Sequence, residues 1–179
     1  MKEDVPAMLA IYAPFVERTA VSFEYDVPSL PAFEARFDAV TARYPWLVWE
    51  QDGRVQGYAY ANVALSRAGY QWCADVTIYL APQAQHTGAG HALYSCLERV
   101  MAQLGYRWLY ALVSASNERS CRFHEHRGYT LQGRFRRCAW KLGKWHDLNW
   151  YGLALCDDAP PDAPPAPFTP EAMEGAFGG

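Results

Sequence analysis

The chain has 179 residues, of which 51% are hydrophobic, so it is long and apolar enough for one folded domain and is not mainly disordered. Its formal net charge is -3, without a run of five like charges or a basic stripe, which argues against a protein that coats nucleic acid or an anionic membrane. We see no signal-peptide pattern and no apolar run long enough to cross a membrane, and we expect a cytoplasmic protein that acts on a small molecule.

Hydrophobic spacing and turn residues predict helices and strands in a mixed order. The expected elements are, in chain order, helices over residues 5–16 and 31–43, strands over 46–50, 55–63 and 70–80, a helix over 90–104, a strand over 108–113, a helix over 117–127, and strands over 129–137 and 149–155. The Asp52-Gly53 pair suits the turn of the first hairpin, where positive φ is needed. Asn117 is expected to cap the short helix. This order predicts an α/β domain built around a sheet.

The composition changes after this domain. Six of the twelve prolines fall between Pro160 and Pro170, in a stretch without the apolar periodicity of a core element. We therefore expect a folded domain over residues 1–156 and a flexible, proline-rich tail over residues 157–179.

The stretch QHTGAG, residues 85–90, joins an expected strand to an expected helix. Its glycines allow a tight turn and a close approach of the backbone, and the free N–H groups of a helix start attract a phosphate. The stretch lacks the Gly-Lys-Ser/Thr ending of a nucleoside triphosphate-binding loop and the full glycine set of a dinucleotide-binding turn. Taken alone, it leaves open whether it binds a phosphate or simply starts a helix.

Several ordered stretches together resemble the GNAT superfamily of acetyl-CoA-dependent N-acetyltransferases. The first is Q-x-x-G-x-G after the strand DVTIYL, and the second is N-x-x-S-x-x-x-H-E-x-x-G-Y over residues 117–129. The stretches SFE (22–24), YPWLVWEQDGRVQGYAYA (44–61), YQWCADVTIYL (70–80) and GKWHDLNW (143–150) look like the phosphinothricin and methionine sulfoximine acetyltransferase subgroup. The likeness covers nearly the whole chain up to about Tyr151.

The resemblance implies an α/β GNAT fold, in which helices flank a mixed, mostly antiparallel central sheet. It also implies an enzyme that moves an acetyl group from acetyl-CoA to an amine, and a homodimer, as in the subgroup. Family members normally begin with a short strand, but here Met1-Lys2-Glu3-Asp4 leads almost directly into the first helix. We therefore expect that the first strand is missing.

The resemblance also implies where acetyl-CoA binds. Backbone amides of the turn would hold the pyrophosphate, and the end of the preceding strand would pair with the pantetheine arm. The implied coenzyme-binding residues are Ile78, Tyr79, Leu80, Gln85, His86, Thr87, Gly88, Ala89, Gly90, His91 and Asn117. For Asn117, the capping role and the coenzyme contact are compatible.

Two catalytic residues are implied in the same way. The subgroup places a glutamate where this sequence has Asp75, which we expect to remove a proton from the amine, directly or through a water. Its alternative role is that of a solvent-facing strand carboxylate. His124 occupies the position of the proton donor to the departing thiolate, and its alternative role is packing or capping.

The expected acceptor is a small amino-acid-like amine of the phosphinothricin, methionine sulfoximine or methionine sulfone type. Phe23 and Arg67 match acceptor-binding positions, although a buried aromatic residue and a surface arginine would look the same. A protein N-terminus or a polyamine is an alternative acceptor, and a CoA-binding module without turnover is an alternative function.

No metal is expected. His124 and His126 are two residues apart and point to different faces of a helix, unlike the i, i+4 histidines of a zinc helix. The five cysteines are widely spaced and suggest neither a zinc cluster nor a disulfide framework.

Overall fold

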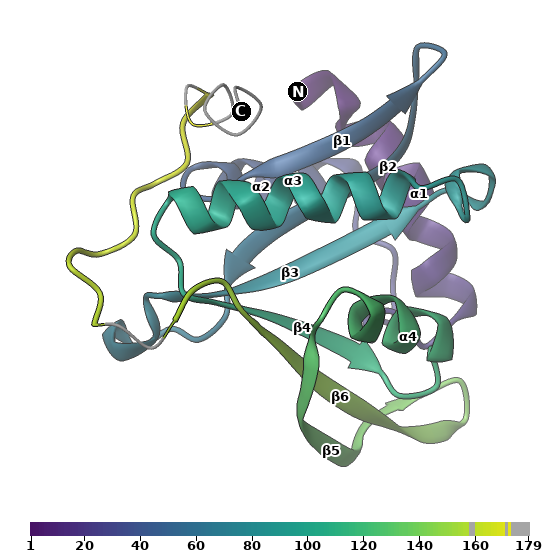
Figure 1. The fold of residues 1–179 in the computed structure, drawn as a ribbon. Helices are drawn as coiled ribbons and strands as arrows, with labels where there is room; N and C mark the ends of the chain where they lie inside the picture. The colour runs from purple at the N-terminus through teal and green to yellow at the C-terminus, as the bar shows by residue number, and fades with distance from the viewer. Residues whose placement is uncertain (158–159, 171, 173–179) are drawn as a thin grey trace.

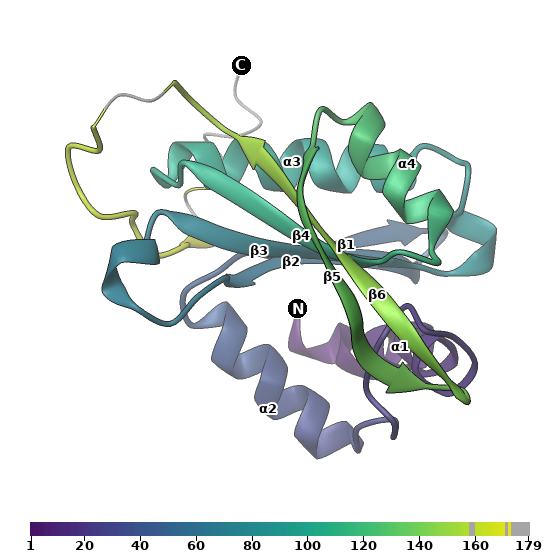
Figure 2. The ribbon, with the colours of Figure 1, turned by 90° about the horizontal axis from the view of Figure 1, so that it is seen from below.

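The computed structural model describes residues 1–157, 160–170 and 172, and its sheet lies between two layers of helices (Figure 1, Figure 2). The strands are β1 (Trp46–Gln51), β2 (Arg54–Val63), β3 (Cys73–Leu80), β4 (Trp108–Ser114), β5 (Thr130–Lys141) and β6 (Lys144–Ala154). They lie in the order β1-β2-β3-β4-β6-β5. The β3–β4 pair is parallel and the other neighbours are antiparallel. The predicted mixed, mostly antiparallel sheet is therefore confirmed.

The helices cover the two faces of the sheet separately, as Figure 2 shows. On one face lie α1 (Val5–Arg18) and α2 (Leu30–Thr41), and on the other lie α3 (Ala89–Gln103) and α4 (Glu118–His126). Short 3-10 helices are η1 (Lys2–Asp4), η2 (Ala68–Tyr70) and η3 (Pro82–Ala84). Each face has its own buried cluster, the smaller one formed by Val5, Met8, Tyr12, Val16, Phe33 and Tyr58. The larger cluster packs the apolar stripe of α3 against the sheet.

Local signals in the sequence explain several boundaries. The Asn117 side chain accepts a hydrogen bond from the Ser120 N–H at 3.2 Å, so it caps α4 as predicted. Ser29 caps α2 in the same way through the Ala32 N–H. Asp52 and Gly53 have φ values of 52° and 68°, which confirms the predicted turn between β1 and β2.

Other boundaries differ from the prediction. The strand predicted over residues 70–80 begins at Cys73, because η2 takes up Ala68–Tyr70. The closing strands are longer than predicted, and their pairing is irregular between Phe135 and Ala139. Arg137 there has a φ of 50°, which breaks the alternation that sequence reading relies on. Residues 2–4 form η1, and no strand precedes α1 in the described residues.

The described part of the tail contacts the domain. The Ala166 N–H donates to the Leu104 carbonyl at 2.9 Å, and the Phe168 N–H donates to the Arg43 carbonyl at 2.8 Å. Pro165 is buried, and Phe168 packs against the larger cluster. Of the predicted flexible tail, residues 158–159, 171 and 173–179 lie outside the described residues. The division of the chain at residue 156 stays a prediction.

Candidate active site

In the described part of the chain, the parallel strands β3 and β4 pair at only three positions. The pairs are Cys73 with Trp108, Ala74 with Leu109, and Asp75 with Tyr110. Beyond these pairs β3 continues to Leu80 and β4 to Ser114, and the two strands separate (Figure 1). Main-chain groups on the facing edges are therefore available to an extended ligand instead of a neighbouring strand.

A cavity of about 530 Å³, open to solvent, is lined by the end of β3, the turn after it, the start of α3, α4, and residues of α1 and the loop after it. Its apolar lining comprises Phe15, Val21, Ile78, Tyr79, Leu80 and Phe123. Its remaining lining comprises Gln85, His86, Gly88, Gly90, His91, Asn117, Arg119, Ser120, Arg122 and His126. All the predicted coenzyme-binding residues except Thr87 and Ala89 are in these two sets. The α4 residues after Asn117, and Phe15 and Val21, were not predicted.

The turn between η3 and α3 leaves the start of α3 open. His86 and Gly88 have left-handed φ values of 64° and 92°, and no side chain caps α3 at Gly88. A Cβ atom at Gly88 would meet nothing within 4 Å, whereas one at Gly90 would lie 3.2 Å from Leu80 Cδ1. The first turn of α3 therefore packs closely on β3 while the space in front of it is free, which suits an anion.

Thr87 and Ala89 support the turn from behind. The Thr87 hydroxyl donates to the Ala84 carbonyl at 2.8 Å and accepts from the Ala89 N–H at 3.4 Å. The Ala89 side chain is fully buried. These two residues therefore hold the shape of the turn, and their side chains do not face the cavity.

The polar lining of the cavity is basic. Arg119 and Arg122 of α4 lie there with three histidines, and neither aspartate nor glutamate is among the described lining residues. The apolar part of the lining comes from α1, β3, α4 and the loop after α1. Such a cavity suits a ligand that combines phosphates with an uncharged arm.

A smaller cavity of about 80 Å³ lies where β3 and β4 separate. Thr77 of β3 and Ala111 of β4 line it from the strands, and Tyr94 of α3 and His124 of α4 line it from the helices. It shares Val21, Ile78, Tyr79, Asn117 and Ser120 with the large cavity. The two cavities are therefore adjacent, and we call the small one, which lies between β3 and β4, the inner cavity.

His124 is held in one tautomer. Its side chain is buried, and Nδ1 lies 2.8 Å from the Ser120 carbonyl, which can only accept, so Nδ1 carries the proton. Burial lowers the pKa of His124 to about 4, and the ring is neutral at pH 7. Nε2 is therefore an acceptor, and it receives a hydrogen bond from the Tyr94 hydroxyl at 3.1 Å.

Asp75 lies at the last position of β3 that pairs with β4, opposite Tyr110 of β4 and Asn62 of β2. Its Oδ1 atom is buried and has no hydrogen-bond partner in the described residues. Burial raises the pKa of Asp75 to about 7, although the Val76 N–H has a smaller lowering effect. Asp75 does not line either cavity. It can reach a ligand there only through an intervening group such as a water.

Asp75 and His124 approach the gap between β3 and β4 from opposite faces of the sheet. Side chains alternate along a strand, so Asp75 shares a face with Tyr79, whose ring packs on Tyr12 of α1 at 4.9 Å. His124 comes from α4 on the other face (Figure 2). A ligand in the gap therefore has the Tyr94–His124 pair on one side and, behind the cavity lining on the other side, the carboxyl group of Asp75.

The predicted acceptor residues lie outside both cavities. Phe23 is partly buried, and its ring centre is 6.0 Å from that of His146. Arg67 is exposed at the N-cap of η2. Val21, from the same loop as Phe23, lines both cavities instead. A single valine in a loop carries no periodic signal, and sequence reading could not have selected it.

Comparison with known proteins identifies the family. The family model described as an acetyltransferase (GNAT) domain matches residues 1–150. The chain belongs to the GNAT acetyltransferase family. This GNAT acetyltransferase is 32% identical to the phosphinothricin N-acetyltransferase of Streptomyces viridochromogenes over 167 residues, which are 93% of this chain and 89% of that protein. It is also 32% identical to the L-methionine sulfoximine/L-methionine sulfone acetyltransferase of Salmonella typhimurium, over 67% of this chain and 70% of that protein.

Solved structures agree with this assignment. A GNAT superfamily phosphinothricin acetyltransferase from Sinorhizobium meliloti, in complex with AcCoA, aligns with a TM-score of 0.83 and 30% identity. The alignment covers 86% of this chain and 84% of that chain. The predicted fold, the enzyme class and the use of acetyl-CoA are therefore confirmed.

Two further features concern the described residues of this GNAT acetyltransferase. None of their helices has both the length and the hydropathy needed to span a membrane. They also contain no group of three or more His, Cys, Asp or Glu side chains that could hold a metal ion.

Proposed function

We propose that this GNAT acetyltransferase acetylates the α-amine of a small amino-acid-like acceptor of the phosphinothricin, methionine sulfoximine or methionine sulfone type. The acceptor class is supported by the names of relatives that align over most of the chain. The observation that carries the chemistry is the inner cavity at the gap between β3 and β4, which has Asp75 near one face and His124 at the other.

The large cavity would bind acetyl-CoA. The open first turn of α3 and the free space at Gly88 fit its pyrophosphate. The unpaired edge of β3, from Ile78 to Leu80, fits the pantetheine arm, and Asn117 lines the same route. An N–H on that edge would also stabilise the oxyanion that forms when the amine attacks the thioester.

Asp75 would receive the proton that the amine loses. An ammonium group has no lone pair, so the acceptor must be deprotonated before it attacks. With its pKa raised to about 7, Asp75 is a stronger base than an ordinary aspartate. Because its carboxylate lies behind the cavity lining, the proton would travel through a water.

Tyr94 and His124 would assist the departing thiolate of CoA. At neutral pH the neutral ring of His124 has no proton on Nε2, so we assign the donated hydrogen bond to the Tyr94 hydroxyl. His124 is then a positioning residue: its Nε2 accepts the hydrogen bond of the hydroxyl until the thiolate forms, when the O–H turns from Nε2 toward the sulfur. Both side chains line the inner cavity.

Acceptor recognition would involve the loop after α1. Val21 lines both cavities, and Phe23 lies two residues further along the same loop. Arg67 belongs to the loop that follows β2, and Asn62 near the end of β2 pairs with Asp75. The carboxylate of an amino-acid acceptor could therefore meet Arg67 at the Asp75 end of β3, away from the phosphate turn.

A thiol-release assay with a panel of amines tests the proposed function. The panel contains phosphinothricin, methionine sulfoximine, methionine sulfone, spermidine and a short peptide with a free N-terminus. We expect turnover of at least one of the three amino-acid analogues and little with the last two amines. Preferred turnover of the peptide or spermidine would replace the proposed acceptor, and release at the background rate with every amine would contradict the acceptor class.

We also propose that the protein acts in the cytoplasm and that it forms a homodimer, the latter as the family resemblance implies. The β5–β6 hairpin exposes large apolar side chains, among them Leu131, Phe135, Trp140 and Trp145, each about half exposed. Such a group on one hairpin is suited to burial against a second copy of the chain. Light scattering should give twice the chain mass of 20.2 kDa, and a mass equal to one chain would contradict the dimer.

A further inference from the structure

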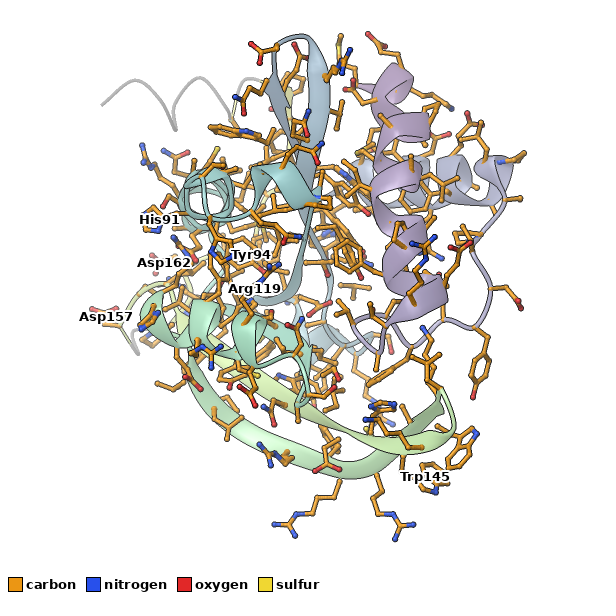
Figure 3. The ribbon with its side chains drawn as sticks, turned by 90° about the vertical axis from the view of Figure 1, so that its right-hand side faces the viewer. His91, Tyr94, Arg119, Trp145, Asp157 and Asp162 are labelled. Atoms are coloured by element: carbon orange, nitrogen blue, oxygen red, sulfur yellow. The ribbon has the colours of Figure 1, made fainter. Side chains whose placement is uncertain are left out.

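Arg119 connects α4 to the turn in front of α3. Its Nη1 atom donates to Gln85 Oε1 at 2.6 Å, and Gln85 Nε2 in turn donates to the Leu80 carbonyl at 3.3 Å. In Figure 3, Arg119 of α4 lies below His91 and Tyr94 of α3. Both Arg119 and Gln85 line the large cavity, so this bridge lies on the wall that a phosphate would approach.

The position of Arg119 is unfavourable in the absence of an anion. It is the second residue of α4, and the positive end of the helix dipole disfavours a cation there. Arg122, one turn further along, pairs with Glu118 at 3.3 Å. Arg119 instead contacts a neutral amide and forms no ion pair in the described residues. With no carboxylate in the described cavity lining, its charge is free to meet an anionic ligand.

We propose that Arg119 determines specificity for the phosphorylated end of acetyl-CoA, by exchanging the Gln85 amide for a phosphate oxygen of the coenzyme. This inference rests on the binding of acetyl-CoA in the large cavity. A guanidinium group offers a planar fork of donors that matches phosphate oxygens, and Gln85 holds that fork at the cavity wall. The pyrophosphate and the 3′-phosphate share this chemistry.

The test compares acetyl donors that lose the phosphates in steps. The KM of wild type and of Arg119→Gln is measured for acetyl-CoA, acetyl-dephospho-CoA and S-acetylpantetheine. We expect the substitution to raise the KM for acetyl-CoA about 10- to 100-fold, as for the loss of a charged hydrogen bond, with little change in kcat. It should leave the KM for S-acetylpantetheine, which has no phosphate, unchanged.

The intermediate donor distinguishes the two phosphates. If Arg119 binds the 3′-phosphate, the effect of Arg119→Gln disappears with acetyl-dephospho-CoA. If Arg119 binds the pyrophosphate, the effect remains with that donor. An equal rise in KM for S-acetylpantetheine, or no rise for acetyl-CoA, would overturn the proposal.

Two further variants control for charge and for folding. Arg119→Lys keeps the charge but loses the fork, and its KM for acetyl-CoA should lie between those of wild type and Arg119→Gln. Arg136→Gln removes an exposed arginine of β5 that lines neither cavity, and it should behave like wild type. Calorimetric titration with CoA, dephospho-CoA and pantetheine repeats the comparison without an acceptor. Failure of the proposed acceptor would therefore leave this test intact.

Discussion

The hydroxyl of Tyr94 donates a hydrogen bond to Nε2 of His124 across 3.1 Å and thereby joins α3 to α4 at the inner cavity. Both side chains are buried, at 1% and 2% exposure, so neither can exchange this partner for bulk water. The Nδ1–H of the same imidazole is directed at the Ser120 carbonyl. The pair therefore has one hydroxyl proton that can turn toward a ligand.

Replacing Tyr94 with phenylalanine removes that hydroxyl and keeps the ring. We expect kcat to fall about 10- to 100-fold with little change in either KM, because a donor to the departing thiolate is lost. Steady-state kinetics with both substrates checks this. Tyr129→Phe is the matched control, since the Tyr129 ring packs on His124 at 5.2 Å but makes no hydrogen bond to it. Equal losses in the two variants would contradict the role of Tyr94.

Replacing Asp75 with asparagine should increase stability and abolish most activity at pH 8. The folded pKa of about 7 lies above the ordinary value of 3.8, so this group stabilises the fold below pH 3.8 and loses that contribution as pH rises through about 7. Asp75→Asn should therefore be more stable than wild type at pH 8, by up to about 4 kcal/mol, and nearly equal at pH 4. Urea unfolding of both proteins at the two pH values measures the difference. The titration of His124 affects the stability of both proteins equally, so it cancels in the comparison.

The activity of the same variant provides the second half of this test. In wild type, kcat/KM should rise through about pH 7, because only the ionised carboxylate accepts a proton. Asp75→Asn should lower kcat/KM about 100-fold and remove that limb. The exposed Asp52→Asn in the hairpin turn should change neither property. A variant that keeps the rising limb would show that another group is the base.

Replacing Gly88 with alanine should weaken acetyl-CoA binding and leave the amine KM unchanged. The φ of 92° costs an L-residue about 1 to 2 kcal/mol, and the new Cβ enters the free space in front of α3. A rise of about 10-fold in the KM for acetyl-CoA is expected. Gly133→Ala on β5 is the control, because a Cβ atom there also has free space but Gly133 does not have a positive φ. Kinetics of the two variants separate the effect of strain at the turn from the effect of replacing any glycine by alanine. Identical KM values for the two would contradict this account.

Replacing Lys141 with methionine should weaken the binding of the amine. The Lys141 ammonium is buried and donates to the carbonyls of Val16 and Ser22 at 2.6 Å each, so it fixes the loop that carries Val21. Loss of these bonds should lower the free energy of unfolding by about 2 kcal/mol and raise the amine KM several-fold. The KM for acetyl-CoA should not change. Denaturant unfolding and kinetics check both effects, and an equal rise in the two KM values would indicate general loosening instead.

The local parts of the fold could be predicted because neighbouring residues determine them. The Asn117 cap, the Asp52-Gly53 turn and the apolar stripe of α3 depend on spacing within a few residues. The start of β3 and the length of β5 could not be predicted from the sequence. They depend on η2 and on the left-handed Arg137, which are set by packing and pairing with distant segments.

The site residues that lie in one continuous stretch of the sequence were predicted. Those that come together only when separate elements fold were missed. The residues at the end of β3 and in the turn were found because they are contiguous and resemble a family motif. Tyr94 was missed because its ring looks like one more core residue of α3, and its contact with His124 links positions thirty residues apart. Arg119 did leave a signal, since a basic residue in the first turn of a helix is unfavourable unless an anion is near.

The proline-containing segment 160–170 has a mechanical consequence for α3. Its bonds to Leu104 and Arg43 fasten the rear end of that helix to the chain just after α2, while the front end carries the glycine turn. The first turn of α3, which no side chain caps, is therefore the end of the helix with fewer fixed contacts. A chain trimmed before residue 160 would lose the two tail bonds, while the apolar stripe of α3 would still pack on the sheet.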